Sequence, residues 1–283
     1  MLEINKIHQG DFSILLKQID DDVIDLTVTS PPYDNLRDYK GYSFDFELIA
    51  KELYRITKDG GIVVWIVADA TINGSETGTS FKQALFFKEI GFNIHDTMIY
   101  AKQNPVPYNH NRYNPQFEYM FIFSKGKPKT FNALREPKKT NGKCGNFRYP
   151  DGSLKPANTL NKDDTKLKNN IWFYIVGTAS GNKEFKHPAS FPEKLAKDHI
   201  LSWSNKGDLV LDPMCGSGTT CKLALLNNRN FIGIEISKEY CEITKKRIEE
   251  HSQQTTLLLS HKTEKEDGIP PTNKLVGILP KRL

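Results

Sequence analysis

The segment Leu209–Thr220, Leu-Val-Leu-Asp-Pro-Met-Cys-Gly-Ser-Gly-Thr-Thr, constrains the fold more than any other part of the chain. Its apolar start predicts a buried strand ending at Asp212, and glycines at 216 and 218 predict a tight turn into a helix. Glu235 ends the next predicted strand 23 residues after Asp212, where nucleotide-binding α/β folds place an acid on ribose hydroxyls. The pattern therefore predicts a nucleoside-type cofactor. The absence of a G-x-x-x-x-G-K-[ST] phosphate loop argues against an NTPase.

Hydrophobic periodicity predicts that strands and helices alternate along most of the chain. Strands are expected at Glu3–His8, Val23–Thr29, Ile62–Val67, Asn93–Tyr100, Phe117–Phe123, Asp208–Asp212 and Phe231–Glu235. Helices are expected at Phe12–Ile19, Phe46–Ile56, Ser80–Ile90, Glu193–Trp203, Thr219–Leu226 and Lys238–Glu250. This alternation predicts an α/β fold with a seven-stranded, mostly parallel sheet covered on both faces. The fourth and fifth strands have no helix between them, which predicts one antiparallel hairpin at an edge.

A second informative segment, Thr29-Ser30-Pro31-Pro32-Tyr33, directly follows a predicted buried strand. Two consecutive prolines fix φ and remove two N–H donors, so the carbonyl groups of Ser30 and Pro31 are left as rigid, outward-pointing acceptors. Acceptors beside a hydroxyl and an aromatic ring suit a flat substrate that carries an NH2 group. A lone Pro-Pro usually marks an ordinary turn. The second signal at Asp212–Thr220 is what favours a functional site.

Positive charge is confined to one segment. The net charge is +5, and residues 125–170 hold 12 Lys and Arg against 4 Asp and Glu, whereas the rest of the chain holds 27 against 30. The same segment is rich in Lys, Asn, Gly and Pro and has little periodicity. It predicts an inserted, partly irregular module whose surface meets phosphates, with a solvated charged loop as the alternative.

Several classes of protein do not fit the sequence. No apolar run approaches the roughly 20 residues that a membrane span needs, and the N-terminus lacks the apolar core of a signal peptide. We therefore expect a cytoplasmic protein without a membrane partner. The cysteines show no Cys-x-x-Cys pair and no His at ligand spacing, which predicts reduced thiols and no metal site. They are Cys144, Cys215, Cys221 and Cys241.

Thr29–Tyr33 and Leu211–Thr220, in that order with a basic segment between them, resemble the amino-methylating DNA methyltransferases of the permuted β group. The resemblance covers about residues 7–247. It implies one Rossmann-like domain written in circularly permuted order, S-adenosylmethionine as cofactor, and double-stranded DNA as partner. A bacterial, archaeal or phage origin is implied as well. The sequence leaves open whether a homodimer forms and whether a cognate restriction endonuclease exists.

The resemblance also divides the chain. Residues 1–124 are expected to form the catalytic half, 125–170 the inserted target-recognition region, 171–251 the cofactor-binding half, and 252–283 a C-terminal tail. On the family's sheet the strand ending at Asp212 is first and Phe231–Glu235 second. Glu3–His8 is third and Val23–Thr29 fourth.

Roles follow from the same resemblance and from the local patterns. The catalytic residues are Ser30, Pro31, Pro32 and Tyr33. The cofactor-binding residues are Asp11, Phe191, Asp212, Pro213, Gly216, Ser217, Gly218, Thr219, Thr220 and Glu235. The DNA-binding residues are Arg37, Tyr39, Lys138, Lys139, Lys143 and Arg148. Without the resemblance, Asp11 reads as a turn residue, Phe191 as the start of a helix, and Arg37 and Tyr39 as an ordinary polar loop.

Ser30 departs from the family's acidic version of the motif, because many members have Asp or Asn there. Among relatives the Ser form is associated more with cytosine N4 than with adenine N6, so cytosine N4 is slightly favoured. The target base must be flipped out of the duplex and stacked, here on Tyr33. No cysteine follows a proline, which argues against ring-carbon methylation. The alternatives are methylation of RNA or of a protein glutamine amide, and a non-catalytic nucleic-acid-binding module.

Overall fold

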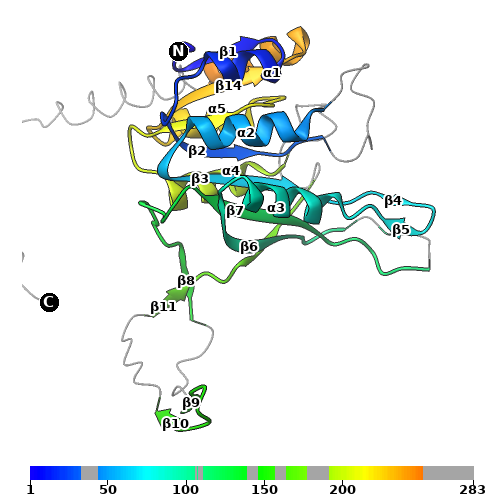
Figure 1. The fold of residues 1–283 in the computed structure, drawn as a ribbon, viewed down its shortest axis with the longest axis vertical. Coiled ribbons are helices and arrows are strands. Elements are labelled where there is room, and N and C mark those ends of the chain that lie inside the picture. Colours follow the sequence, from blue (N-terminus) through cyan, green and yellow to red (C-terminus); the bar gives the residue numbers. More distant parts are fainter. Residues whose placement is uncertain are drawn as a thin grey trace, which may run out of the picture.

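The computed structural model describes residues 1–32, 44–105, 107, 111–138, 146–156, 164–176 and 191–250. Its main body is an eight-stranded sheet in the order β1-β14-β13-β2-β3-β7-β6-β12, with helices on both faces (Figure 1). The strands are β1 Lys6–Gln9, β2 Ile24–Thr29, β3 Thr57–Val67, β6 Asn93–Lys102, β7 Phe117–Ser124, β12 Ile171–Tyr174, β13 Leu209–Asp212 and β14 Asn230–Glu235.

The strand order confirms the order that the resemblance implies. In the family's strand numbering, β13 is the first strand, β14 the second, β1 the third and β2 the fourth. The observed sheet has them side by side in the order β1-β14-β13-β2, so β13 lies between β14 and β2. Neighbours from β1 to β3 pair in parallel, whereas β7 is antiparallel to both β3 and β6. The mostly parallel sheet with one antiparallel hairpin is therefore as predicted.

Two hydrophobic clusters lie on the two faces of the sheet. The helices α1 (Phe12–Leu15), α2 (Phe46–Ile56) and α3 (Thr79–Glu89) cover one face, and α4 (Glu193–Trp203) and α5 (Thr219–Leu226) cover the other (Figure 1). Alternate residues of β3 belong to the two clusters. Val63 and Trp65 are part of the cluster under α2 and α3, while Val64 and Ile66 are part of the cluster under α4 and α5. Burial on both faces is why the strand reads as a continuous apolar run.

The sheet has one strand more than predicted. The segment Ile171–Tyr174 pairs in parallel with β6, opposite Ile99–Lys102, and forms the outer edge. The hairpin of β6 and β7 therefore lies one strand in from the edge. The apolar, aromatic character of this segment was visible in the sequence, but its place beside β6 depends on pairing across about 70 residues of intervening chain.

Several element boundaries differ from the prediction by a few residues, and the largest difference is at β3. The strand β3 begins at Thr57 rather than at Ile62, directly where α2 ends. The glycines after α2 were expected to separate the helix from the strand, but the strand continues across them. Gly60 has φ +80°, and the register against β2 shifts at this point, as in a β-bulge. The predicted helix Phe12–Ile19 is α1 followed by a 3-10 turn at Leu16–Gln18. The bounds of α2, α4 and α5 are those predicted, and residues 238–250 are helical.

The described parts of the predicted insertion form two short strand pairs outside the sheet. The strand β8 (Arg135–Pro137) pairs with β11 (Thr165–Leu167), and β9 (Asn146–Arg148) pairs with β10 (Leu154–Pro156). Figure 1 shows them projecting beyond the β6–β12 end of the sheet. A further hairpin, β4 (Thr71–Ile72) with β5 (Ser75–Glu76), was not predicted. No helix among the described residues is long and apolar enough to cross a membrane.

Candidate active site

The ends of β2 and β13 bring the two motifs together. The strands pair in parallel, with Leu26 opposite Val210 and Thr27 opposite Leu211, so their carboxyl ends meet at the same edge. The Thr29 hydroxyl donates to Asp212 Oδ1 over 2.9 Å, and the Thr220 hydroxyl donates to the carbonyl of Val28 over 3.1 Å. The chain then diverges, from β13 to β14 on one side and from β2 to β3 on the other. Parallel α/β sheets bind ligands at such a point.

The proline motif is rigid where it meets this edge. Pro31 is buried, and Ser30 and Pro32 are half-buried. The predicted catalytic residue Tyr33 and the predicted DNA contacts Arg37 and Tyr39 lie outside the described residues.

The glycine turn after β13 needs its glycines. Gly216 and Gly218 have φ values of +50° and +74°, a region that L-residues with side chains rarely adopt. A Cβ at Gly218 would also lie 2.1 Å from Cγ2 of Thr244. The Thr244 hydroxyl donates to the carbonyl of Gly216 over 2.8 Å, so the helix at 238–250 packs directly against the turn. The backbone of residues 215–218 is consequently held in one conformation.

Two buried acids flank the turn. Glu235 accepts hydrogen bonds from the backbone N–H of Gly216 (2.9 Å) and of Ser237 (2.8 Å), and burial raises its pKa. Asp212 is 2% exposed, and burial raises its pKa to about 6, although Thr29 and the backbone N–H of Met214 donate to it. Carboxylates fixed in this way keep further acceptor capacity for the hydroxyl or ammonium groups of a ligand.

Asp11 and Phe191, two further predicted cofactor residues, come from other elements. The backbone N–H of Gly10 donates to the carbonyl of Glu235, so Asp11 lies next to the end of β14, where it caps α1 by accepting from the N–H of Ser13 (2.7 Å). Phe191 is half-buried just before α4 and packs against the core cluster on that face. The cofactor contacts that the resemblance implies for Asp11 and Phe191 stay predictions.

A family model described as DNA methylase matches residues 24–246, most of the chain. The chain belongs to this family. It is 57% identical to the orphan methyltransferase M.BamHII of Bacillus amyloliquefaciens, over 83% of this chain and 92% of that protein. Among solved structures, the M1.HpyAVI–SAM complex is 26% identical with a TM-score of 0.60, covering 86% of this chain and 98% of that one. The cytosine-N4-specific PvuII DNA methyltransferase is 22% identical with a TM-score of 0.63, covering 85% of each chain.

Membership of the DNA methylase family makes the chain an S-adenosylmethionine-dependent DNA methyltransferase. The described residues fit that cofactor. Buried carboxylates, Asp212 and Glu235, stand at the ends of two adjacent strands, β13 and β14. A nucleoside with ribose hydroxyls and an amino-acid ammonium group offers the donors that these acceptors require.

Two of the predicted basic residues belong to the part of the insertion outside the sheet. Arg148 ends β9 and Lys138 directly follows β8, and these strand pairs project beyond the β6–β12 end of the sheet (Figure 1). The insertion leaves the sheet at Ser124, which pairs with Ile62 at the amino end of the parallel strands. Lys139 and Lys143 lie outside the described residues.

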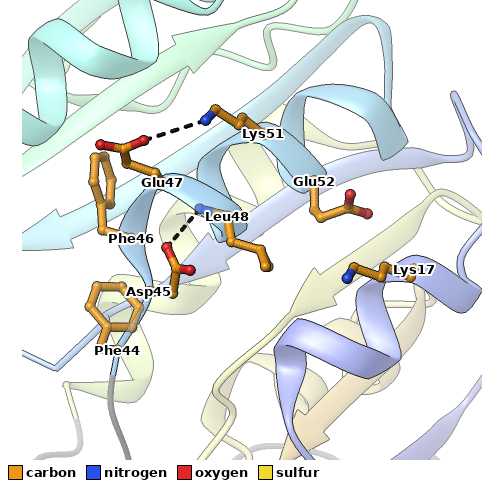
Figure 2. A pocket seen from close by; sticks show the side chains of 8 residues that line it. All are labelled: Lys17, Phe44, Asp45, Phe46, Glu47, Leu48, Lys51 and Glu52. Carbon is orange, nitrogen blue, oxygen red and sulfur yellow. Dashed lines mark hydrogen bonds and ion pairs between the residues drawn. The ribbon is translucent and has the colours of Figure 1, made fainter.

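A separate pocket of about 830 Å³ lies between α2 and the 3-10 turn after α1. Figure 2 shows its lining, in which Asp45 accepts from the N–H of Leu48 and Lys51 pairs with Glu47. Its lining is Lys17, Phe44, Asp45, Phe46, Glu47, Leu48, Lys51 and Glu52. None of these is a predicted site residue, but the ring of Phe44 contacts the ring of Phe12, which follows Asp11, with centroids 5.9 Å apart.

The sequence analysis did not predict the residues of the last helix that form hydrogen bonds with the glycine turn. Thr244 and Arg247 are three residues apart in the last helix, and both donate to turn carbonyls, those of Gly216 and Ser217. Their spacing places them on one helix face. The sequence did not reveal what that face would contact. Cys215, Cys221 and Cys241 are buried free thiols around the same turn.

Proposed function

We propose that this DNA methyltransferase methylates an exocyclic amino group of a base flipped out of double-stranded DNA, with cytosine N4 favoured over adenine N6. The observation that carries the proposal is the buried hydrogen bond from Thr29 to Asp212. It fixes Ser30, one residue beyond Thr29, beside the turn that follows Asp212. A substrate amine held at one motif and a methyl donor held at the other are then neighbours.

The cofactor-binding roles rest on the geometry around that turn. S-adenosylmethionine, when bound, supplies an electrophilic methyl group on a sulfonium centre. Asp212 and Glu235 would accept hydrogen bonds from its ammonium and hydroxyl groups, while Asp11 and Phe191 flank the adenine. The turn and the first residues of α5 would line the middle of the cofactor with close backbone. These residues are Pro213, Gly216, Ser217, Gly218, Thr219 and Thr220.

The catalytic roles follow from hydrogen-bond chemistry. An exocyclic amine is a poor nucleophile because its lone pair is delocalised into the base. The Ser30 hydroxyl and a backbone carbonyl near Pro31 would accept both N–H bonds, favour a pyramidal nitrogen and aim its lone pair at the methyl group. Serine is neutral and cannot take up a proton as a carboxylate can, so the surplus proton leaves to solvent after transfer. Pro32 keeps the motif rigid, and Tyr33 would stack on the flipped base.

DNA contacts would come from two places. Arg37 and Tyr39 follow the catalytic motif directly in the sequence, and the described strand pairs of the basic segment project beyond the β6–β12 end of the sheet. Lys138, Lys139, Lys143 and Arg148 would contact phosphates. The surplus of positive charge in this segment, 12 Lys and Arg against 4 Asp and Glu, supports a target-recognition role for the insertion.

Two partner assignments are also proposals. The relative M.BamHII is named an orphan methyltransferase, which supports activity without a dedicated restriction endonuclease. The second candidate partner is another copy of the chain, in a homodimer. Analytical ultracentrifugation of the purified chain, with and without DNA, measures whether the homodimer forms.

Mass spectrometry of nucleosides from DNA methylated by the purified chain tests the reaction. We expect N4-methylcytosine. N6-methyladenine as the only product would overturn the choice of base and keep the mechanism, whereas 5-methylcytosine would overturn both. Tyr33→Ala should lower turnover while leaving cofactor binding nearly intact, because stacking on one base contributes about 1–3 kcal/mol. Methylation of RNA in preference to duplex DNA would contradict the substrate assignment.

A further inference from the structure

One carboxylate joins the elements on both sides of the proposed cofactor site. Glu193, the first residue of α4, accepts at Oε1 from the ammonium group of Lys222 in α5 and from Nη2 of Arg247, the latter over 2.9 Å. Arg247 also donates through Nη1 to the carbonyl of Ser217 in the glycine turn. We call Glu193, Lys222 and Arg247 the α4 brace.

The α4 brace is buried where charged side chains are costly. Lys222 and Arg247 are 5% and 4% exposed in their side chains, and Glu193 is 31% exposed. Burial lowers the pKa of Lys222 and of Arg247, while Glu193 favours their charged forms. Buried ion pairs add little net stability over apolar side chains of the same shape, but they fix geometry because any displacement leaves a charge unpaired.

The geometry that the α4 brace fixes spans the proposed site. Phe191 and Pro192 immediately precede Glu193, and the backbone N–H of Leu195 bonds to the carbonyl of Pro192, so the position of Glu193 determines where Phe191 lies. At the other end, Arg247 holds Ser217, between the two glycines of the turn. One carboxylate and one guanidinium therefore link the segment at 191–192 to the turn.

We propose that Glu193 is a positioning residue, which through Arg247 and Lys222 holds the segment at 191–192 and the turn at 215–218 apart by the distance that S-adenosylmethionine requires. This inference rests on the proposed function, in which Phe191 and the turn contact the same cofactor. The α4 brace touches no reacting atom in this arrangement. It sets the affinity for the cofactor and leaves the rate of methyl transfer from the filled site unchanged.

The test compares two charge clusters on the same helix. Glu193→Gln removes the anion of the α4 brace. Asp198→Asn is the matched control, because Asp198 is buried on α4 and accepts from Lys168, Lys194 and Tyr174 on the side away from the turn. For the full-length chain, calorimetry gives the dissociation constant for S-adenosylmethionine, thermal unfolding gives Tm, and steady-state assays give KM and kcat.

We expect Glu193→Gln to raise the dissociation constant and the KM for S-adenosylmethionine about tenfold, the size typical of removing one charge-assisted hydrogen bond. Its kcat at saturating cofactor should stay within about twofold. Asp198→Asn should lower Tm without changing the dissociation constant. If Glu193→Gln does not fold, Arg247→Lys tests the same prediction, because one ammonium group lacks the fork of donors by which the guanidinium bonds to Glu193 and to the Ser217 carbonyl together.

Unchanged cofactor affinity in Glu193→Gln, or a fall in kcat with no change in KM, would overturn the proposal. An equal loss of affinity in Asp198→Asn would do the same, because the effect would then reflect general loosening of α4. Glu235→Ala separates this failure from failure of the proposed site. If Glu235→Ala also binds the cofactor normally, the site itself is wrong; if only Glu193→Gln does, the positioning role alone is wrong.

Discussion

The hydroxyl of Thr29 donates a 2.9 Å hydrogen bond to the carboxylate of Asp212, and both side chains are buried. The two residues lie 183 positions apart and end two adjacent parallel strands. This hydrogen bond joins the segment proposed to hold the base to the segment proposed to hold the methyl donor.

The first prediction compares two threonines on β2. Thr29→Val should destabilise the fold by about 1–3 kcal/mol, because the buried acceptor on Asp212 loses its donor. Thr27→Val should be neutral or stabilising, since the buried Thr27 hydroxyl has no hydrogen-bond partner among the described residues. Urea unfolding of both variants gives the two free energies. Equal losses would mean that the Thr29 bond adds nothing to stability.

The second prediction concerns pH. The folded-state pKa of Asp212 is about 6, above its ordinary value of 3.8, so the folded chain binds more protons than the unfolded chain between these values. The stability that this group contributes is thus full below about pH 4 and is lost as pH rises through about 6. Without cofactor, Asp212→Asn should be more stable than the wild type at pH 7, by on the order of 3 kcal/mol. Near pH 4 the two should converge. A difference that does not vary with pH would show that Asp212 is ionised normally in the fold.

The third prediction isolates Glu235. Glu235→Ala should weaken binding of S-adenosylmethionine by about 1–3 kcal/mol, the usual cost of removing hydrogen bonds to a charged group. Glu235→Gln keeps one acceptor oxygen for the backbone N–H groups and should bind with intermediate affinity. Isothermal calorimetry measures both. Wild-type affinity in Glu235→Ala would remove this residue from the site.

The fourth prediction tests the turn. Gly218→Ala should cost more than the roughly 1–2 kcal/mol of a left-handed alanine, because its Cβ would also meet Thr244. Gly207→Ala is the control, since Gly207 has φ +86° with nothing within 4 Å of the added Cβ. Thermal unfolding should rank Gly218→Ala below Gly207→Ala. The reverse order would show that the turn or the Thr244 side chain moves to accommodate the added Cβ at little cost in stability.

The fifth prediction concerns the basic segment. DNA binding should weaken steeply with salt, and the triple variant Lys138→Gln, Lys139→Gln, Lys143→Gln should flatten the slope of log K against log salt by about 0.9 for each phosphate that is no longer neutralised. Lys6→Gln, exposed on the edge strand β1 at the other end of the sheet, should leave the slope unchanged. An unaltered slope in the triple variant would identify the segment as a solvated loop.

Local patterns in the sequence were enough for most elements and for both motifs. The bounds of α2, α4 and α5 follow from apolar periodicity and from the stop signals next to them. The positions of Asp212, Gly216, Gly218 and Glu235 at strand ends and in the turn could be predicted because strand, turn and helix follow one another within a short stretch.

Only the tertiary structure decided which distant segments meet. Pairing of Ile171–Tyr174 with β6 adds the eighth strand, and the passage of β3 through Gly60 depends on its register against β2. The convergence of Glu193, Lys222 and Arg247 on the turn is of the same kind. Each residue looks like an ordinary polar position on its own helix. Their contacts are fixed by how three helices pack, and periodicity within one helix carries no information about its neighbours.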